Sequence, residues 1–218
     1  MQRKALIFDF DLTLADSSQG IFQCVNFAMQ QLGYPSFEYD IIKKLIGFTL
    51  PDTFRMLTGI EEAEKGKEFT THYVKHADLV MNQNTFLFPE VFKVIPKLKE
   101  QGFLMAIVST KYRYRISGVL ERDKLSNCFD YIIGGEDVSQ HKPNPEGLEL
   151  AIQKLGIGKE NAIYIGDTTI DLETAQRAKV KFIGVLTGTT READFKTNLN
   201  GGRIIKDLNH LLATIETL

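Results

Sequence analysis

Short apolar runs alternate with longer amphipathic stretches along most of this chain. Such continuous apolar runs are typical of strands that are covered on both faces, as in a parallel sheet. The helical stretches between them supply the crossovers that parallel strands require. The strands are predicted at Ala5–Phe8, Leu104–Val108, Tyr131–Ile133, Ala162–Ile165 and Phe182–Val185. The pattern therefore predicts an α/β fold built on a parallel sheet.

One long segment interrupts this alternation. Residues 18–102 lie between the first two predicted strands and contain no convincing strand, although a crossover needs only about a dozen residues. Helices are predicted instead at Ser18–Leu32, Tyr39–Ile46, Pro51–Leu57 and Glu61–Val80, followed by Pro89–Gln101, which returns to the sheet. We therefore expect an α-helical bundle domain at residues 17–87, inserted into a sheet domain formed by residues 1–16 and 88–218.

The bulk composition excludes several classes of partner. The chain is 43% hydrophobic and 25% charged, with a formal net charge of −2, which gives no electrostatic case for binding nucleic acid or a membrane surface. No apolar run approaches the roughly 20 residues of a membrane-spanning helix, and no signal peptide is recognisable. Cys24 and Cys128 lie far apart and are predicted to be buried, reduced thiols. These features predict a cytoplasmic protein.

The chemistry begins where the first predicted strand ends. Asp9 and Asp11 follow this apolar run, and Thr13 follows them. An ionised carboxylate costs several kcal/mol to bury unless a cation compensates it. Aspartates are also common in turns and helix caps, so the pair alone permits a structural interpretation.

Polar residues also follow the other predicted strands. Ser109-Thr110-Lys111 follows the second, His141-Lys142-Pro143 lies beyond the third, and Gly166-Asp167-Thr168-Thr169-Ile170-Asp171 follows the fourth. Ligands of open parallel sheets bind outside the carboxyl ends of the strands, where the winding direction reverses. With the strand order 5-4-1-2-3, counted along the chain, Asp9 faces Asp167 at that reversal.

Crowded carboxylates repel each other by roughly 4 kcal/mol per pair at 4 Å and an effective dielectric near 20. An all-oxygen site of this kind favours Mg²⁺, and Lys142 would neutralise the remaining charge. Ser109 is expected where a helix begins, so that its hydroxyl and the following N–H groups form an anion site. Together these parts indicate phosphoryl transfer, with Asp9 as nucleophile and Asp11 as acid and base.

Four segments, DFDLTLADS, IVSTK, HKPNP and IGDTTID, resemble in sequence and order the four motifs of the haloacid dehalogenase-like hydrolase superfamily. The C-terminal region from Phe182 further resembles the phosphoglycolate phosphatase-like branch. The resemblance implies a Rossmann-like core and a helical cap of the kind inserted after the first strand. It also implies a small phosphorylated metabolite as substrate.

The resemblance also implies roles for individual residues. Catalysis would be carried by Asp9, Asp11 and Lys142; phosphate would be bound by Ser109, Thr110 and Lys142; Mg²⁺ would be bound by Asp9, Asp167 and the backbone carbonyl of Asp11; Thr13 and Asp171 would support the site. An acid at position 11 argues against dehalogenases and phosphonatases. Three positions depart from the family pattern: Leu12 and Glu90 stand where glycine is usual, and Ser109 where threonine is common.

Several alternatives stay open from the sequence. Asp171 is also suited to capping a helix at Leu172–Ala178, Thr13 to bonding the backbone of its own turn, and Lys111 either to solvent or to substrate. A phosphosugar mutase resembling β-phosphoglucomutase is a second candidate. Inorganic pyrophosphatase is a third, because the segment beginning Ile46-Gly47 resembles a cap pattern of related branches. A catalytically idle binding protein is a fourth. We expect a monomer or a homodimer.

Overall fold

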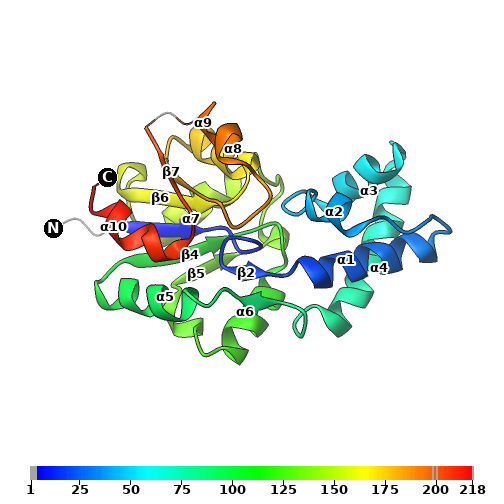
Figure 1. Cartoon of the computed structure of the whole chain (residues 1–218), viewed down its shortest axis with the longest axis horizontal. Helices are drawn as coiled ribbons and strands as arrows, with labels where there is room; N and C mark the ends of the chain where they lie inside the picture. Colours follow the sequence, from blue (N-terminus) through cyan, green and yellow to red (C-terminus); the bar gives the residue numbers. More distant parts are fainter. Residues whose placement is uncertain (1–3, 198, 200, 218) are drawn as a thin grey trace. The chain divides into compact units, whose positions relative to one another are not determined.

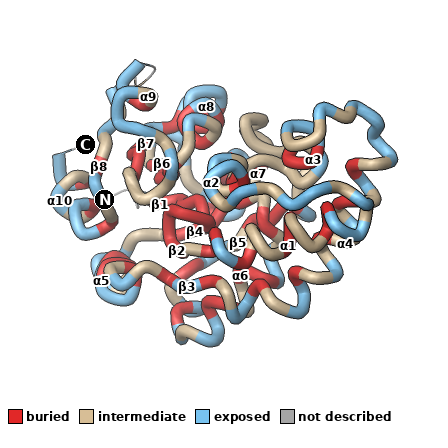
Figure 2. Tube along the Cα trace, turned by 45° about the vertical axis from the view of Figure 1, so that its right-hand side comes forward, coloured by how far each residue is buried: buried red, intermediate tan, exposed pale blue. Residues whose placement is uncertain are grey.

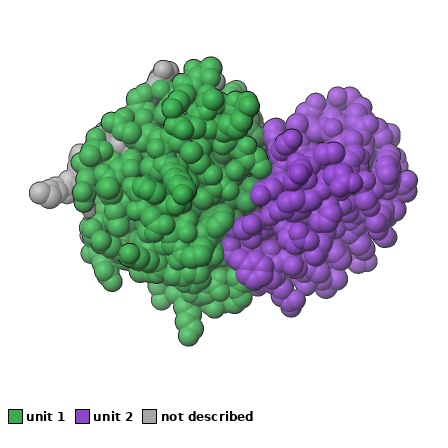
Figure 3. All heavy atoms as spheres, viewed as in Figure 1, with its two compact units in different colours: residues 1–15, 87–218 green, residues 16–86 purple. Residues whose placement is uncertain are grey.

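The chain folds into two compact units, which Figure 3 distinguishes by colour. Unit 1 contains Met1–Ala15 and Leu87–Leu218, and unit 2 contains Asp16–Phe86. The computed structural model describes residues 4–197, 199 and 201–217. The division falls at the two points where the helical segment leaves and rejoins the rest of the chain.

Unit 1 is built on a parallel sheet. In the described part of the chain the sheet has six strands in the order β5-β4-β1-β6-β7-β8, and every adjacent pair is parallel. The strands are β1 (Ala5–Phe8), β4 (Leu104–Val108), β5 (Tyr131–Ile133), β6 (Ala162–Gly166), β7 (Lys181–Val185) and β8 (Arg203–Ile205). The predicted α/β class and the relative order of the five predicted strands are confirmed.

Helices cover both faces of this sheet. They are α5 (Val91–Glu100), α6 (Arg113–Arg122), α7 (Glu146–Leu155), α8 (Thr169–Ala178), α9 (Glu192–Lys196) and α10 (Leu211–Ile215). Leu6 and Phe8 of β1 pack into an apolar cluster with α5, α6 and α10, while Ala5 and Ile7 pack into a second cluster with α7, α8 and α9. Because successive strand side chains point to opposite faces, a continuous apolar run is what this double layer requires. Figure 1 shows the layers, and Figure 2 shows the buried central strands.

Three short strands were not predicted from the sequence. β8 adds an edge strand to the sheet, and β2 (Ala15–Asp16) pairs with β3 (Phe86–Leu87) in a separate two-stranded sheet. The expectation of no strand within residues 18–102 is therefore wrong at β3. β2 and β3 have two residues each and β8 begins with an arginine, so none of these strands is itself a run of three apolar residues like β5.

Unit 2 is helical. Its helices are α1 (Ser18–Gln31), α2 (Tyr39–Lys43), α3 (Leu50–Thr58) and α4 (Ala63–Val80), packed around a third apolar cluster. This cluster includes Phe54 and Phe69, whose ring centroids are 5.5 Å apart. Cys24 lies in it, but Cys128 of unit 1 is only partly buried, so the prediction of burial is wrong for Cys128. Among the helices of the described residues, none combines the length and apolar character needed to cross a membrane.

Candidate active site

The polar side chains of the site follow neighbouring strands of unit 1. Asp9 follows β1, Ser109 follows β4 and Asp167 follows β6, and β1 lies between the other two strands. The amide of Asp9 donates to the carbonyl of Ile165 over 2.8 Å, and the amide of Ser109 donates to the carbonyl of Ile133 over 3.0 Å. The sheet ladder therefore fixes the backbone at both strand ends.

Three buried carboxylates gather at this edge. Asp9, Asp167 and Asp171 each have an oxygen within 4.8 Å of the others, and their exposed fractions are 2%, 1% and 0%. Burial raises the pKa of Asp9 to about 7. The neighbouring carboxylates of Asp171 and Asp11 also raise this pKa, and together these effects outweigh Lys142, which lowers it. Burial, with Asp171 and Asp9, also raises the pKa of Asp167 well above its usual value. The cluster has more negative charge than the protein itself neutralises.

Lys142 lies among these carboxylates. Its Nζ is 3.0 Å from Asp9 Oδ1 and 2.7 Å from Asp171 Oδ1, and its side chain is 5% exposed. Burial on its own lowers the pKa of an ammonium, but Asp171 and Asp9 raise the pKa of Lys142 well above its usual value. The contact with Asp9 is an ion pair without hydrogen-bonding geometry, so Asp9 Oδ1 is a buried oxygen with no hydrogen bond among the described residues.

Asp171 holds Lys142 in place and is itself held by several donors. Its Oδ1 accepts hydrogen bonds from Lys142 Nζ and, over 2.9 Å, from the hydroxyl of Tyr164. Its Oδ2 accepts from the amide and the hydroxyl of Thr168, which is the true N-cap of α8, so Asp171 is the third helical residue and not the cap. Gly166 permits this approach, because a Cβ there would lie 2.5 Å from Asp171 Cβ.

Asp11 has a different environment. Its carboxylate pairs with Lys111, whose Nζ lies 2.7 Å from Oδ1 and 3.0 Å from Oδ2. The sequence suggested either solvent or substrate as the contact of Lys111, and neither prediction included this ion pair. The signal available in the sequence was the position of Lys111 three residues beyond the end of a strand that neighbours β1. Leu12 adopts a φ of 60°, a left-handed conformation that favours the glycine usual at this position.

Thr13 contacts the carboxylate cluster directly. Its hydroxyl donates to Asp167 Oδ1 over 2.9 Å, which corrects the expectation that it bonds only its own turn. The loop after β7, which the sequence analysis missed, also belongs to the site: Thr187 donates its hydroxyl to the Leu12 carbonyl over 2.6 Å. A Cβ at Gly188 would lie 1.9 Å from Asp167 Oδ2, so this loop passes directly over the carboxylate.

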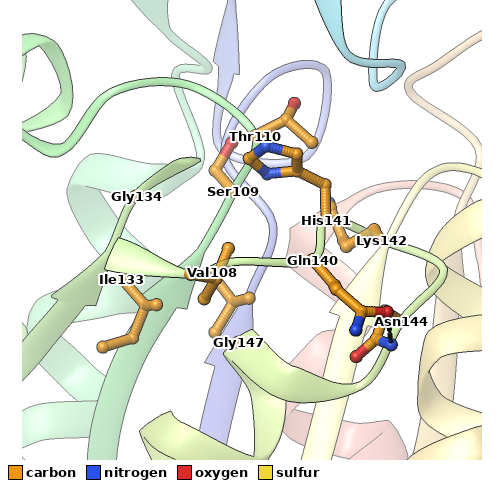
Figure 4. Close-up of a pocket in the computed structure, with 11 residues that line it drawn as sticks. Val108, Ser109, Thr110, Ile133, Gly134, Gln140, His141, Lys142, Asn144 and Gly147 are labelled. Atoms are coloured by element: carbon orange, nitrogen blue, oxygen red, sulfur yellow. Dashed lines mark hydrogen bonds between the residues drawn. The ribbon is translucent and has the colours of Figure 1, made fainter. Parts of the chain in front are cut away.

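Ser109 and Thr110 line a small pocket with Val108, Gln140, His141 and Lys142, as Figure 4 shows. The expected helix start at Ser109 is wrong, because α6 begins at Arg113 and has Tyr112 as its N-cap. Ser109 instead accepts a hydrogen bond from the amide of Lys111 over 3.3 Å, in a tight bend. An anion here would meet hydroxyls and a lysine rather than a helix N-terminus.

The chain is similar to known hydrolases and phosphatases. The family model described as haloacid dehalogenase-like hydrolase matches residues 6–185. The chain is 35% identical over 185 residues to a phosphoglycolate phosphatase from Rhodobacter capsulatus, which covers 82% of each chain. It is 27% identical over 215 residues to the pyrophosphatase PpaX from Oceanobacillus iheyensis, which covers 99% of this chain and 98% of PpaX. A crystal structure from Bacteroides fragilis described as a haloacid dehalogenase-like hydrolase superposes with a TM-score of 0.93 at 45% identity, over 96% of this chain and all of that one.

Proposed function

The chain belongs to the haloacid dehalogenase-like hydrolase family as one of its phosphatases, and we propose that it hydrolyses small phosphomonoesters with Mg²⁺ through a phosphorylated Asp9. One observation carries this proposal. The buried Asp9 Oδ1 has no hydrogen bond among the described residues, yet it lies beside Lys142 and the other carboxylates of the cluster. An unbonded carboxylate oxygen next to a fixed positive charge is suited to nucleophilic attack on phosphorus.

The donor set fits Mg²⁺, which prefers carboxylate and carbonyl oxygens. We assign Asp9 and Asp167 as carboxylate ligands, with the main-chain carbonyl of Asp11 as the ligand that the family resemblance implies. Asp171 is better suited to orienting Lys142, since donors already reach both of its oxygens. When bound, the ion supplies positive charge to the cluster and to the oxygens of a substrate phosphate.

The reaction proceeds in two displacements. In the first, Asp9 forms a bond to phosphorus, the bond to the ester oxygen breaks, and Asp11 gives the departing alcohol the proton that it took from water in the preceding turnover. In the second, Asp11 takes a proton from water as the water oxygen attacks phosphorus, and the bond to Asp9 breaks. Lys142 neutralises the charge that develops on the phosphoryl oxygens, and Ser109 and Thr110 orient them.

We propose further that unit 2 is a cap domain, with limits at residues 17 and 87. This domain would close over the site during phosphoryl transfer. The phosphatase relatives support a small, soluble substrate such as phosphoglycolate or a sugar phosphate. Inorganic pyrophosphate is the second candidate, because the resemblance to PpaX extends over nearly the whole chain. Initial rates with phosphoglycolate, hexose phosphates and pyrophosphate at equal concentration rank these substrates.

Replacing the nucleophile tests the mechanism. Asp9→Asn preserves the size of the side chain but removes the attacking oxyanion, so turnover of p-nitrophenyl phosphate should fall by about 10⁴-fold or more. The matched control is Asp194→Asn, which changes a partly exposed aspartate of α9 in the same unit. Acid-quenched wild-type enzyme should carry phosphate on Asp9 when examined by mass spectrometry. Full activity of the Asp9→Asn variant contradicts the proposal.

A further inference from the structure

Lys111 is a second buried lysine of unit 1, outside the carboxylate cluster. Its Nζ bridges both oxygens of Asp11, at 2.7 and 3.0 Å, and the two side chains are only 5% and 10% exposed. Exposed ion pairs restrict side chains little, but a lysine that contacts both oxygens of a buried carboxylate opposes its rotation. The contact therefore fixes the orientation of Asp11.

The backbone of Lys111 is fixed on both sides. Its amide donates to Ser109 Oγ, and its carbonyl accepts a hydrogen bond from the amide of Gly135 over 3.1 Å. Gly135 permits this close approach, because a Cβ there would lie 2.4 Å from the carbonyl oxygen of Thr110. The loop after β5 therefore holds the backbone of Lys111 in place through this hydrogen bond.

The Asp11 side of the contact is equally constrained. Asp11 forms an isolated backbone β-bridge with Ala15, and the amide of Leu12 donates to the carbonyl of Ala15 over 2.7 Å. Leu12, with its left-handed φ, completes this turn, and the Thr187 hydroxyl donates a hydrogen bond to the Leu12 carbonyl. Both partners of the ion pair therefore project from rigid backbone.

We propose that Lys111 is a positioning residue that holds Asp11 for the second displacement and so determines how long the phosphorylated enzyme survives. The inference rests on the proposed function. In that step Asp11 takes a proton from water, the water oxygen bonds to phosphorus, the bond from phosphorus to Asp9 breaks, and its electron pair returns to the Asp9 carboxylate. An oriented Asp11 favours transfer of the phosphoryl group to water over transfer to a sugar, and hence a phosphatase over a mutase.

Lys111→Met tests this role with p-nitrophenyl phosphate, whose leaving group departs without a proton. The first displacement should proceed normally and the second should slow, so kcat should fall by about tenfold to a hundredfold. KM should fall in proportion and leave kcat/KM unchanged. A burst of p-nitrophenolate should appear, and acid quenching should trap more phosphorylated Asp9 than in the wild type. Lys111→Arg, which restores the charge, should recover part of kcat, and Lys99→Met, which changes a half-exposed ion pair, should change none of these values.

A raised KM with a lowered kcat/KM would show that Lys111 binds substrate, and an unchanged KM without a burst would show general loss of structure; either result overturns the proposal. The double variant Lys111→Met, Asp11→Asn avoids an unpaired buried charge. It should match Asp11→Asn alone in kcat, and a further loss overturns the proposal. If wild-type enzyme forms no phosphorylated Asp9, the proposed function itself fails. If it forms this species and Lys111→Met leaves its lifetime unchanged, only the role of Lys111 fails.

Discussion

Two buried lysines of unit 1 differ in the number of carboxylates that surround them. Lys142 lies in a group of three aspartates, two of which it contacts within 3.0 Å, whereas Lys111 contacts the carboxylate of Asp11. Burial, together with the excess of negative charge in the first group, raises the pKa of Asp9 and Asp167, whereas the second group pairs one positive with one negative charge. The proposed mechanism accordingly places the cation at the Lys142 group and gives Lys111 the role of orienting a carboxylate.

Among the tests that compare these two groups, removing Lys142 should have the largest effect. Lys142→Met leaves buried carboxylates without their cation, a change that typically costs about 3–5 kcal/mol of stability. The same change should lower kcat for p-nitrophenyl phosphate by about 10²–10³-fold, because the charge developing on phosphate loses its neighbour. Thermal unfolding and steady-state kinetics measure the two effects.

Lys111→Met is the matched comparison for that variant. If the charge imbalance is specific to the Lys142 group, added Mg²⁺ should restore more of the lost melting temperature in Lys142→Met than in Lys111→Met. Equal restoration in both variants would contradict the assignment of the cation to the cluster.

The pH dependence of the Mg²⁺ effect should be the next largest. In the folded, metal-free protein the pKa of Asp9 is raised from 3.8 to about 7, so between these values the folded state binds a proton that the unfolded state has released. This carboxyl therefore makes the folded protein lose stability as the pH rises through that window. Mg²⁺ competes with the proton, so it should raise the melting temperature more at about pH 8 than at about pH 5.5.

Two variants test whether Asp9 is the source of that pH dependence. Asp9→Asn should flatten the difference between the two pH values, and Asp194→Asn should preserve it, because Asp194 is partly exposed and does not belong to the carboxylate cluster. A Mg²⁺ effect on the wild type that does not change with pH would be evidence against a cation at Asp9.

The sequence indicated the strands more reliably than the contacts between side chains. Continuous apolar runs identified the central strands, because strands covered on both faces leave a strong pattern, whereas β8 and β3 contain only two apolar residues each. Asp9, Lys142 and Asp167 were expected to meet because the topology brings strand ends together. The Lys111–Asp11 pair and the loop at Gly188 depend on side-chain reach and loop path, which periodicity does not encode.

The hydrogen bond from Thr13 to Asp167 offers the finest test of the contrast between the two groups. Thr13→Val keeps the shape of the side chain but removes the hydroxyl that donates to Asp167 Oδ1, so stability should fall by only about 1 kcal/mol. If Asp167 is a ligand, losing a hydrogen bond that orients it should weaken Mg²⁺ binding by about tenfold, measured as the half-saturating concentration for activity and for the rise in melting temperature.

Thr174→Val is the matched control for this smallest effect. It removes another buried threonine hydroxyl, which donates to the Ile170 carbonyl within α8. We expect a similar loss of stability with unchanged Mg²⁺ half-saturation. Equal weakening of Mg²⁺ binding in both variants would mean that Thr13 acts through general stability. A loss confined to Thr13→Val assigns the cation to Asp167, the carboxylate that Thr13 orients.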